Sequence, residues 1–177
     1  MGQLNPFRFI EDYGDVFRFV DEMLFLHGEP TNMRQYEADA ALLASIIGLV
    51  FEVHGLFANP INDENSEHCF EFLGRLFTID HDLPALDLMM KQLCEGVDYD
   101  NERHRWVRSR WIRPKPNCLP VVEWRRFRSF SDKEQWESYR RCQALVRFLC
   151  GEGRERFCAR LVSDRMRREL ESIGAGC

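Results

Sequence analysis

Apolar residues recur every three to four positions along most of this chain, which is the spacing of a helix that buries one face. In residues 6–28 acidic residues occupy the rest of the circumference, and Asn5 can cap the start just ahead of Pro6. Residues 70–77 and 82–96 carry shorter versions of the same pattern. These three segments predict amphipathic helices that pack one face on a common core.

Residues 36–54 stand apart because they are apolar nearly all round the helix. A helix without a polar face is buried, so this segment predicts the central helix of a bundle. Its uncharged run from Ala40 to Phe51 has 12 residues, whereas a membrane-spanning helix needs about 20. The chain is therefore expected to have no membrane segment.

The last third of the chain predicts two further helices joined by a short turn. Ser131 and Glu134 have the spacing of a capping box, in which each side chain bonds the other residue's backbone N–H. The helix that starts there continues to about Leu149, and Gly151 and Gly153 then turn the chain into a final helix. Because the connection is so short, we expect an antiparallel helical hairpin.

Residues 96–119 are the least regular part, since three prolines interrupt any long element. Residues 105–113 fit either a short helix or an extended segment, and residues 121–127 suggest another short helix. With 177 residues the chain fits one domain. The prediction is a single all-α domain over residues 1–177, a bundle of about six to eight helices with a buried central helix and a C-terminal hairpin.

Charge divides the chain into two parts of opposite sign. Residues 1–102 hold 5 Lys and Arg against 20 Asp and Glu, net −15, whereas residues 103–177 hold 19 against 9, net +10. Such segregation has two interpretations: the acidic and basic parts pack on each other, or the basic part serves an external anionic partner. Of these two interpretations, packing of the acidic part on the basic part is favoured.

Arginine and aromatic residues alternate in the basic part, which has 17 Arg and only 2 Lys. Arg offers a planar fork for phosphate or carboxylate, and aromatic rings offer stacking platforms. The candidate residues for binding a partner or a nucleic acid are Arg105, Trp106, Arg108, Arg110, Trp111, Arg113, Trp124, Arg125, Arg126 and Arg128.

Seven cysteines are present, but none of them forms a CxxC pair. The sequence therefore predicts no zinc ribbon and no thioredoxin-like site, and it indicates reduced structural thiols in the cytoplasm or nucleus. No catalytic residue, resident metal or cofactor is expected, because no serine–histidine–aspartate order, phosphate loop or metal helix is present.

His54, the pair His81-Asp82 and a later Asp98 or Asp100 follow one another in the order His, His-Asp, Asp. This order resembles the HD phosphohydrolases, an all-α family. The resemblance implies a divalent metal held by these side chains that activates water on a phosphate ester.

Leu83-Pro84, Leu88-Met89 and a Val-x-x-x-Trp ending at Trp111 resemble an F-box. That family is a helical module of about 45 residues that docks onto the adaptor subunit of ubiquitin ligases. The resemblance covers less than a fifth of the chain, and the alignment requires one inserted residue.

Taken together, the pattern favours a non-enzymatic intracellular interaction or regulatory protein, of the adaptor or viral host-modulating type, that binds a protein partner through helical surfaces. Many Phe and Met residues on amphipathic helices suit a groove for a partner helix or peptide. The alternative is binding of RNA or single-stranded nucleic acid through the Arg/Trp-rich part. The two resemblances are more remote alternatives, and the sequence fixes neither the partner, the oligomeric state nor the role of Cys177.

Overall fold

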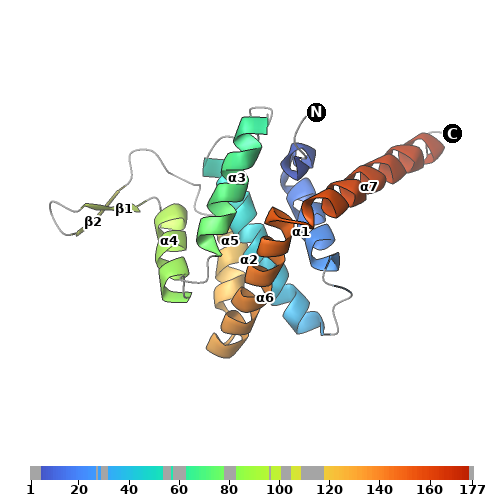
Figure 1. Ribbon diagram of the computed structural model, residues 1–177. Helices are drawn as coiled ribbons and strands as arrows, with labels where there is room; N and C mark the ends of the chain where they lie inside the picture. The colour runs from blue at the N-terminus through green and yellow to red at the C-terminus, as the bar shows by residue number, and fades with distance from the viewer. Residues whose placement is uncertain are drawn as a thin grey trace.

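The computed structural model describes residues 5–26, 28, 32–53, 57, 63–77, 83–95, 97–100, 105–108 and 118–175. Within them the chain forms a 3₁₀ turn, seven α-helices and a two-stranded antiparallel sheet (Figure 1). The predicted all-α bundle of six to eight helices is confirmed. In chain order the elements are η1 (Pro6–Phe9), α1 (Tyr13–Phe25), α2 (Met33–Val53), α3 (Asp63–Leu76), α4 (Leu83–Glu95), β1 (Val97–Asp100), β2 (Arg105–Arg108), α5 (Leu119–Arg128), α6 (Asp132–Cys150) and α7 (Arg154–Ala175).

Helix α2 is the centre of the bundle, as its apolar circumference predicts. Every residue from 41 to 51 is buried, and α1, α4, α5 and α6 all pack against it. The side chain of Asn32 accepts the backbone N–H of Arg34 at 2.9 Å and so caps the helix start. The hydroxyl of Ser45, fully buried, donates to the carbonyl of Leu42 at 2.8 Å, which satisfies this polar group inside the core.

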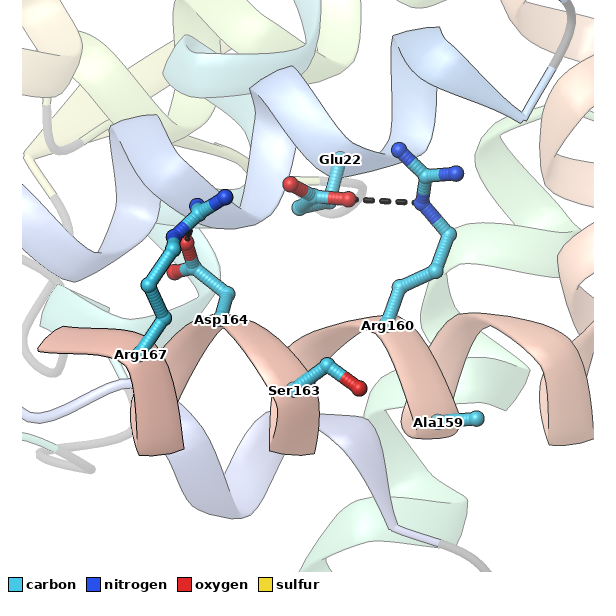
Figure 2. A pocket seen from close by; sticks show the side chains of 6 residues that line it. All are labelled: Glu22, Ala159, Arg160, Ser163, Asp164 and Arg167. Carbon is cyan, nitrogen blue, oxygen red and sulfur yellow. Dashed lines mark hydrogen bonds and ion pairs between the residues drawn. The ribbon is translucent and has the colours of Figure 1, made fainter. Parts of the chain in front are cut away.

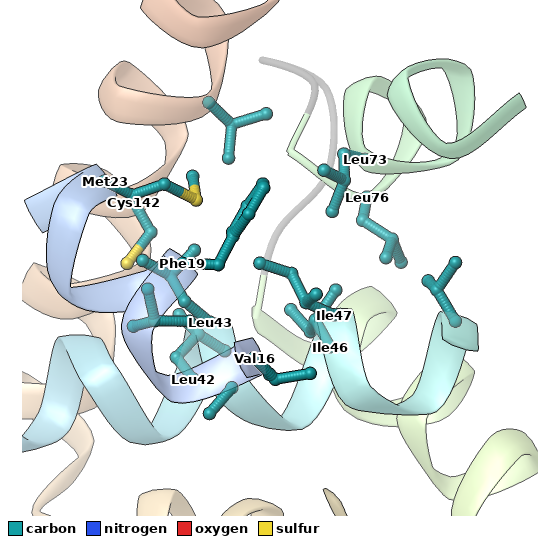
Figure 3. Packing of buried hydrophobic residues seen from close by; sticks show 14 of the residues in the cluster. Val16, Phe19, Met23, Leu42, Leu43, Ile46, Ile47, Leu73, Leu76 and Cys142 are labelled. Carbon is teal, nitrogen blue, oxygen red and sulfur yellow. The ribbon is translucent and has the colours of Figure 1, made fainter. Parts of the chain in front are cut away.

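The core joins residues from both charge parts of the chain. Figure 3 shows α1, α2, α3 and α6 converging on it with their apolar side chains. Aromatic rings fill the end near η1, where Phe7 stacks on Phe19 at 5.2 Å and Phe19 meets Phe157 edge-on at 4.8 Å. The labelled residues are Val16, Phe19, Met23, Leu42, Leu43, Ile46, Ile47, Leu73, Leu76 and Cys142.

A glycine explains how closely α5 approaches the central helix. A Cβ on Gly48 of α2 would lie 2.8 Å from Cγ of Pro120, well inside van der Waals contact. Pro120 lies in the first turn of α5, where a missing N–H costs no helical hydrogen bond. The proline that ends the irregular segment therefore also starts the predicted short helix.

The N-terminal helix begins later than the sequence predicts. Asn5 caps only the 3₁₀ turn η1, and Ile10 is extended. Asp12 then caps α1 by accepting the N–H of Asp15 at 2.8 Å, while the Asp15 carboxylate accepts the N–H of Glu11 at 3.0 Å. This reciprocal pair of bonds outcompetes continuation of one helix from Pro6.

The C-terminal helices are confirmed, although α7 takes a different course from that of a tight hairpin. The capping box of Ser131 and Glu134 is present at the start of α6. The turn through Gly151 and Gly153 follows, and α7 then packs against α1 and η1 as well as α6. Figure 1 shows its second half extending away from the bundle, so α7 does not fold back along α6 over its whole length.

The ambiguous segment near residue 105 is extended. Strand β2 pairs antiparallel with β1, with Asp100 opposite Arg105 and Val97 opposite Arg108. The F-box resemblance implies helix throughout this stretch, and the hairpin is therefore a departure from it.

Candidate partner-binding groove

The arginines of the basic part are used largely to hold the molecule together. Among the residues that the structure describes, eight ion pairs join the basic part to the acidic part, and they involve α5, α6 and α7. The pairs are Arg126–Glu37, Arg128–Asp87, Arg141–Asp39, Arg154–Glu67, Arg160–Glu22, Arg165–Glu11, Arg168–Asp15 and, with the sense reversed, Glu134–Arg34. The first interpretation of the segregated charge, two complementary surfaces, therefore describes the fold.

Four of the candidate binding residues lie on α5. Trp124 is only 8% exposed and packs on Phe127 with 5.3 Å between ring centroids, so its faces are not open for stacking. Arg126 reaches Glu37 and Glu123, and Arg128 reaches Asp87 at 3.5 Å. Arg125 is exposed and also makes an interaction of its own.

The other six candidates lie on or beyond the β-hairpin. Arg105, Trp106 and Arg108 belong to β2, while Arg110, Trp111 and Arg113 fall outside the described residues. The structure thus places four of the ten candidates on one helix, α5.

A concave surface lies between α1 and α7. Two adjoining hollows of about 460 and 520 Å³ share Glu22, Asp164 and Arg167 as lining residues. Figure 2 shows the first of them, with Glu22 reaching across from α1 toward Arg160 on α7. The second continues toward the start of α2. We call the two hollows together the α1/α7 groove.

Opposite charges neutralise each other along the floor of this groove. Arg160 donates to Glu22 at 2.7 Å, and Arg167 donates to Asp164 at 2.5 Å. Burial raises the pKa of Asp21 above its ordinary value, and the neighbouring Glu22 carboxylate adds to this effect. The Glu22–Arg160 and Asp164–Arg167 pairs are therefore already formed in the groove, which suits docking rather than proton transfer.

Charge also ties α1 to α7 just beyond the groove. Burial opposes ionisation of Asp15, but hydrogen bonds from Arg18 and the Glu11 N–H, together with the Arg168 charge, outweigh it and lower the pKa of Asp15. The carboxylate is thus held ionised between the two helices.

Exposed apolar side chains gather around the groove. Seven of the ten large apolar side chains that the described residues expose belong to α1, the start of α2 or α7. From Val162 to Gly174 no residue of α7 is buried, and Met166 is 58% exposed. The seven are Phe17, Phe25, Met33, Val162, Met166, Leu170 and Ile173. Such a concentration of exposed apolar residues on the helices that border the groove is typical of an interaction surface.

The cysteines behave as structural thiols. Cys69, Cys118, Cys142, Cys150 and Cys158 are free. Burial raises the pKa of Cys69 to about 11 and also raises those of Cys142, Cys150 and Cys158. Since the thiolate is the reactive form, these four thiols are poor nucleophiles at neutral pH.

The described residues add no support to the resemblance to the HD phosphohydrolases or to the F-box. His54, His81 and Asp82 lie outside the described residues. Among the side chains that are described, no group of three or more His, Cys, Asp or Glu could hold a metal ion. In that same part of the chain, no helix combines the length and the apolar content that crossing a membrane requires.

A comparison with protein-family models, with curated proteins and with solved structures finds no match for this chain. Its function must therefore be argued from its own surfaces.

The apolar residues of α7 do not all face the core. Phe157 and Leu161 are indeed buried, but Met166 and Leu170 are exposed. The sequence did contain a signal: on a helical projection the second pair is displaced from the first by more than a quarter turn. One helix therefore carries two apolar faces, and only one of them faces the core.

Proposed function

We propose that this chain is a non-enzymatic interaction or regulatory protein, of the adaptor or host-modulating type, that binds a protein partner at the α1/α7 groove. The observation that carries the proposal is the collection of exposed apolar side chains beside this groove. Phe25 and Met33 line its second hollow, and α7 adds an exposed apolar face next to it. An amphipathic helix or peptide docks on such a surface by burying its own apolar face.

The placement of the arginines supports a protein partner over a nucleic acid. Arg126 and Arg128 already face carboxylates, and Trp124 is buried. The whole chain carries a net charge of −5, which repels a polyanion. The free thiols suit a reducing compartment, so we place the protein in the cytoplasm or nucleus.

Affinity capture from nuclease-treated lysate tests the proposal with the variants Phe25→Glu and Met166→Glu. Each variant puts a charge among the exposed apolar side chains, and we expect binding of the captured protein to fall at least ten-fold, about 1.4 kcal/mol. Val122→Glu is the matched control, because Val122 is a comparably exposed apolar residue on α5, away from the groove. Equal capture by all three variants, or capture that nuclease abolishes, would contradict the proposal.

A further inference from the structure

Two arginines of α6 take no part in the ion pairs that close the fold. Arg141 on the same helix is paired with Asp39, and Arg154 and Arg160 on α7 are paired with Glu67 and Glu22. Arg140 and Arg147 are exposed, and neither makes an ion pair with a described residue. Their charge is therefore available at the surface.

The two arginines share one face of the helix with a third cation. Lys133, Arg140 and Arg147 are seven residues apart, which is two helical turns, so they line up along about 21 Å of α6. Trp136 and Ala144 are exposed on the same face. The opposite face, with residues such as Cys142 and Leu149, is buried in the core. We call Lys133, Trp136, Arg140 and Arg147 the α6 outer face.

Trp136 fixes the orientation of Arg140 without using up its hydrogen-bond donors. The guanidinium carbon of Arg140 lies 4.8 Å from the centre of the Trp136 ring. Stacking occupies the flat face of the guanidinium, whereas its N–H groups point outward in the plane. Arg140 is thus held in position to donate two parallel bonds to a carboxylate. The indole itself remains 37% exposed and offers apolar surface beside the cation.

We propose that the α6 outer face binds an acidic segment of a protein partner, one that carries carboxylates about 10 Å apart and an apolar residue between them. The inference rests on the proposed function, since it names the chemistry of the partner. It is separate from the groove, which lies between α1 and α7. Charge complementarity identifies the occupant: Arg140 and Arg147, which make no ion pair with a described residue, lie two helical turns apart, and a helix with Asp or Glu seven residues apart matches that spacing.

A protein segment fits this face better than a nucleic acid does. Glu137 lies among the cations, is half exposed, and is 4.0 Å from Lys133. A strand with a phosphate at every nucleotide would place negative charge against Glu137, whereas a peptide can carry a neutral residue there.

Selection from a phage library of random 16-residue peptides tests the inference. The full-length protein is the bait, and the double variant Arg140→Glu/Arg147→Glu is compared with it. The control is Arg8→Glu/Arg156→Glu, which changes the net charge equally at two other exposed arginines. Because Arg140 and Arg147 have no carboxylate partner among the described residues, the test variant is expected to keep the thermal midpoint of the wild type.

The expected result is enrichment of peptides with Asp or Glu seven residues apart flanking an apolar residue. Their affinity should fall at least ten-fold in the test variant, fall also in Trp136→Ala, and stay unchanged in the control. Absence of enrichment, or equal affinity for wild type and test variant, overturns the inference. If the selected peptides lose their binding to the Met166→Glu variant and not to the test variant, the inference about the α6 outer face is overturned, whereas the proposed function at the α1/α7 groove still stands. Tighter binding of a random single-stranded RNA 20-mer through the same arginines overturns it as well.

Discussion

The pair formed by Arg141 and Asp39 gives the sharpest test of how the two charge parts hold together. The Asp39 carboxylate is 8% exposed and accepts two hydrogen bonds from the Arg141 guanidinium, each 2.9 Å long. Replacing Arg141 by Met keeps an unbranched apolar stem but removes both donors. The carboxylate is then left buried without a partner, a situation that costs about 3–5 kcal/mol at a fully buried site.

The expected loss for Arg141→Met is smaller than that limit because the arginine itself is 34% exposed and water can reach the vacated space. We expect about 2–3 kcal/mol, which for a chain of this size lowers the thermal midpoint by roughly 4–12 °C. Asp39→Asn should cost less, about 1–2 kcal/mol, because the amide oxygen still accepts a hydrogen bond and the arginine turns to solvent. Removing the cation is therefore predicted to be worse than removing the anion.

Urea denaturation monitored by circular dichroism measures these differences in the free energy of unfolding. Arg126→Met is the matched control, since Arg126 is more exposed and lies 3.9 Å from Glu37, a geometry worth about 0–1 kcal/mol. The double variant Asp39→Asn/Arg141→Met should be more stable than the sum of the single losses predicts. If Arg141→Met costs no more than Arg126→Met, the ion pairs between the parts do not stabilise the fold in the way described here.

Two further predictions concern packing and pH. Gly48→Ala is expected to destabilise the protein by about 1–3 kcal/mol because its methyl group meets Pro120, whereas Gly74→Ala, with open space around its position, should be neutral or stabilising in the same urea titration. Arg34 lowers the pKa of Glu134 to about 2, so the ionised carboxylate stabilises the fold above its unfolded pKa near 4.5. That contribution is lost as the pH falls toward 2, and Glu134→Gln should therefore destabilise the protein at pH 6 but not at pH 2, as thermal melts at both pH values would show; an equal effect at both would contradict the assignment.

Local signals predicted the helices well because the information lies within a few residues. The capping box at Ser131 and the apolar circumference of α2 were both read from short windows. Ion pairs between residues far apart in the sequence could not be predicted from such short windows. Arg141, for example, pairs with Asp39, a residue 102 positions away.

The candidate surfaces show the same limit. Composition marked Trp124 and its neighbouring arginines as a binding face. In the structure α5 packs against α2, Trp124 is buried, and Arg126 and Arg128 form ion pairs with Glu37 and Asp87. Trp136, by contrast, was not among the candidates, yet its side chain is 37% exposed on α6. Which tryptophan reaches the surface depends on how the helices cross, and the spacing of residues along the sequence does not give the crossing geometry.

The long separation between ion-pair partners has a consequence for the newly synthesised chain. Glu11 and Glu22 leave the ribosome about 140 to 150 residues before Arg165 and Arg160 do. Until then the emerging segment is a polyanion whose carboxylates repel one another and disfavour compaction. Assembly of this helical body is therefore coupled to the synthesis of α6 and α7, and a chain stopped before α6 should remain expanded and be open to proteases.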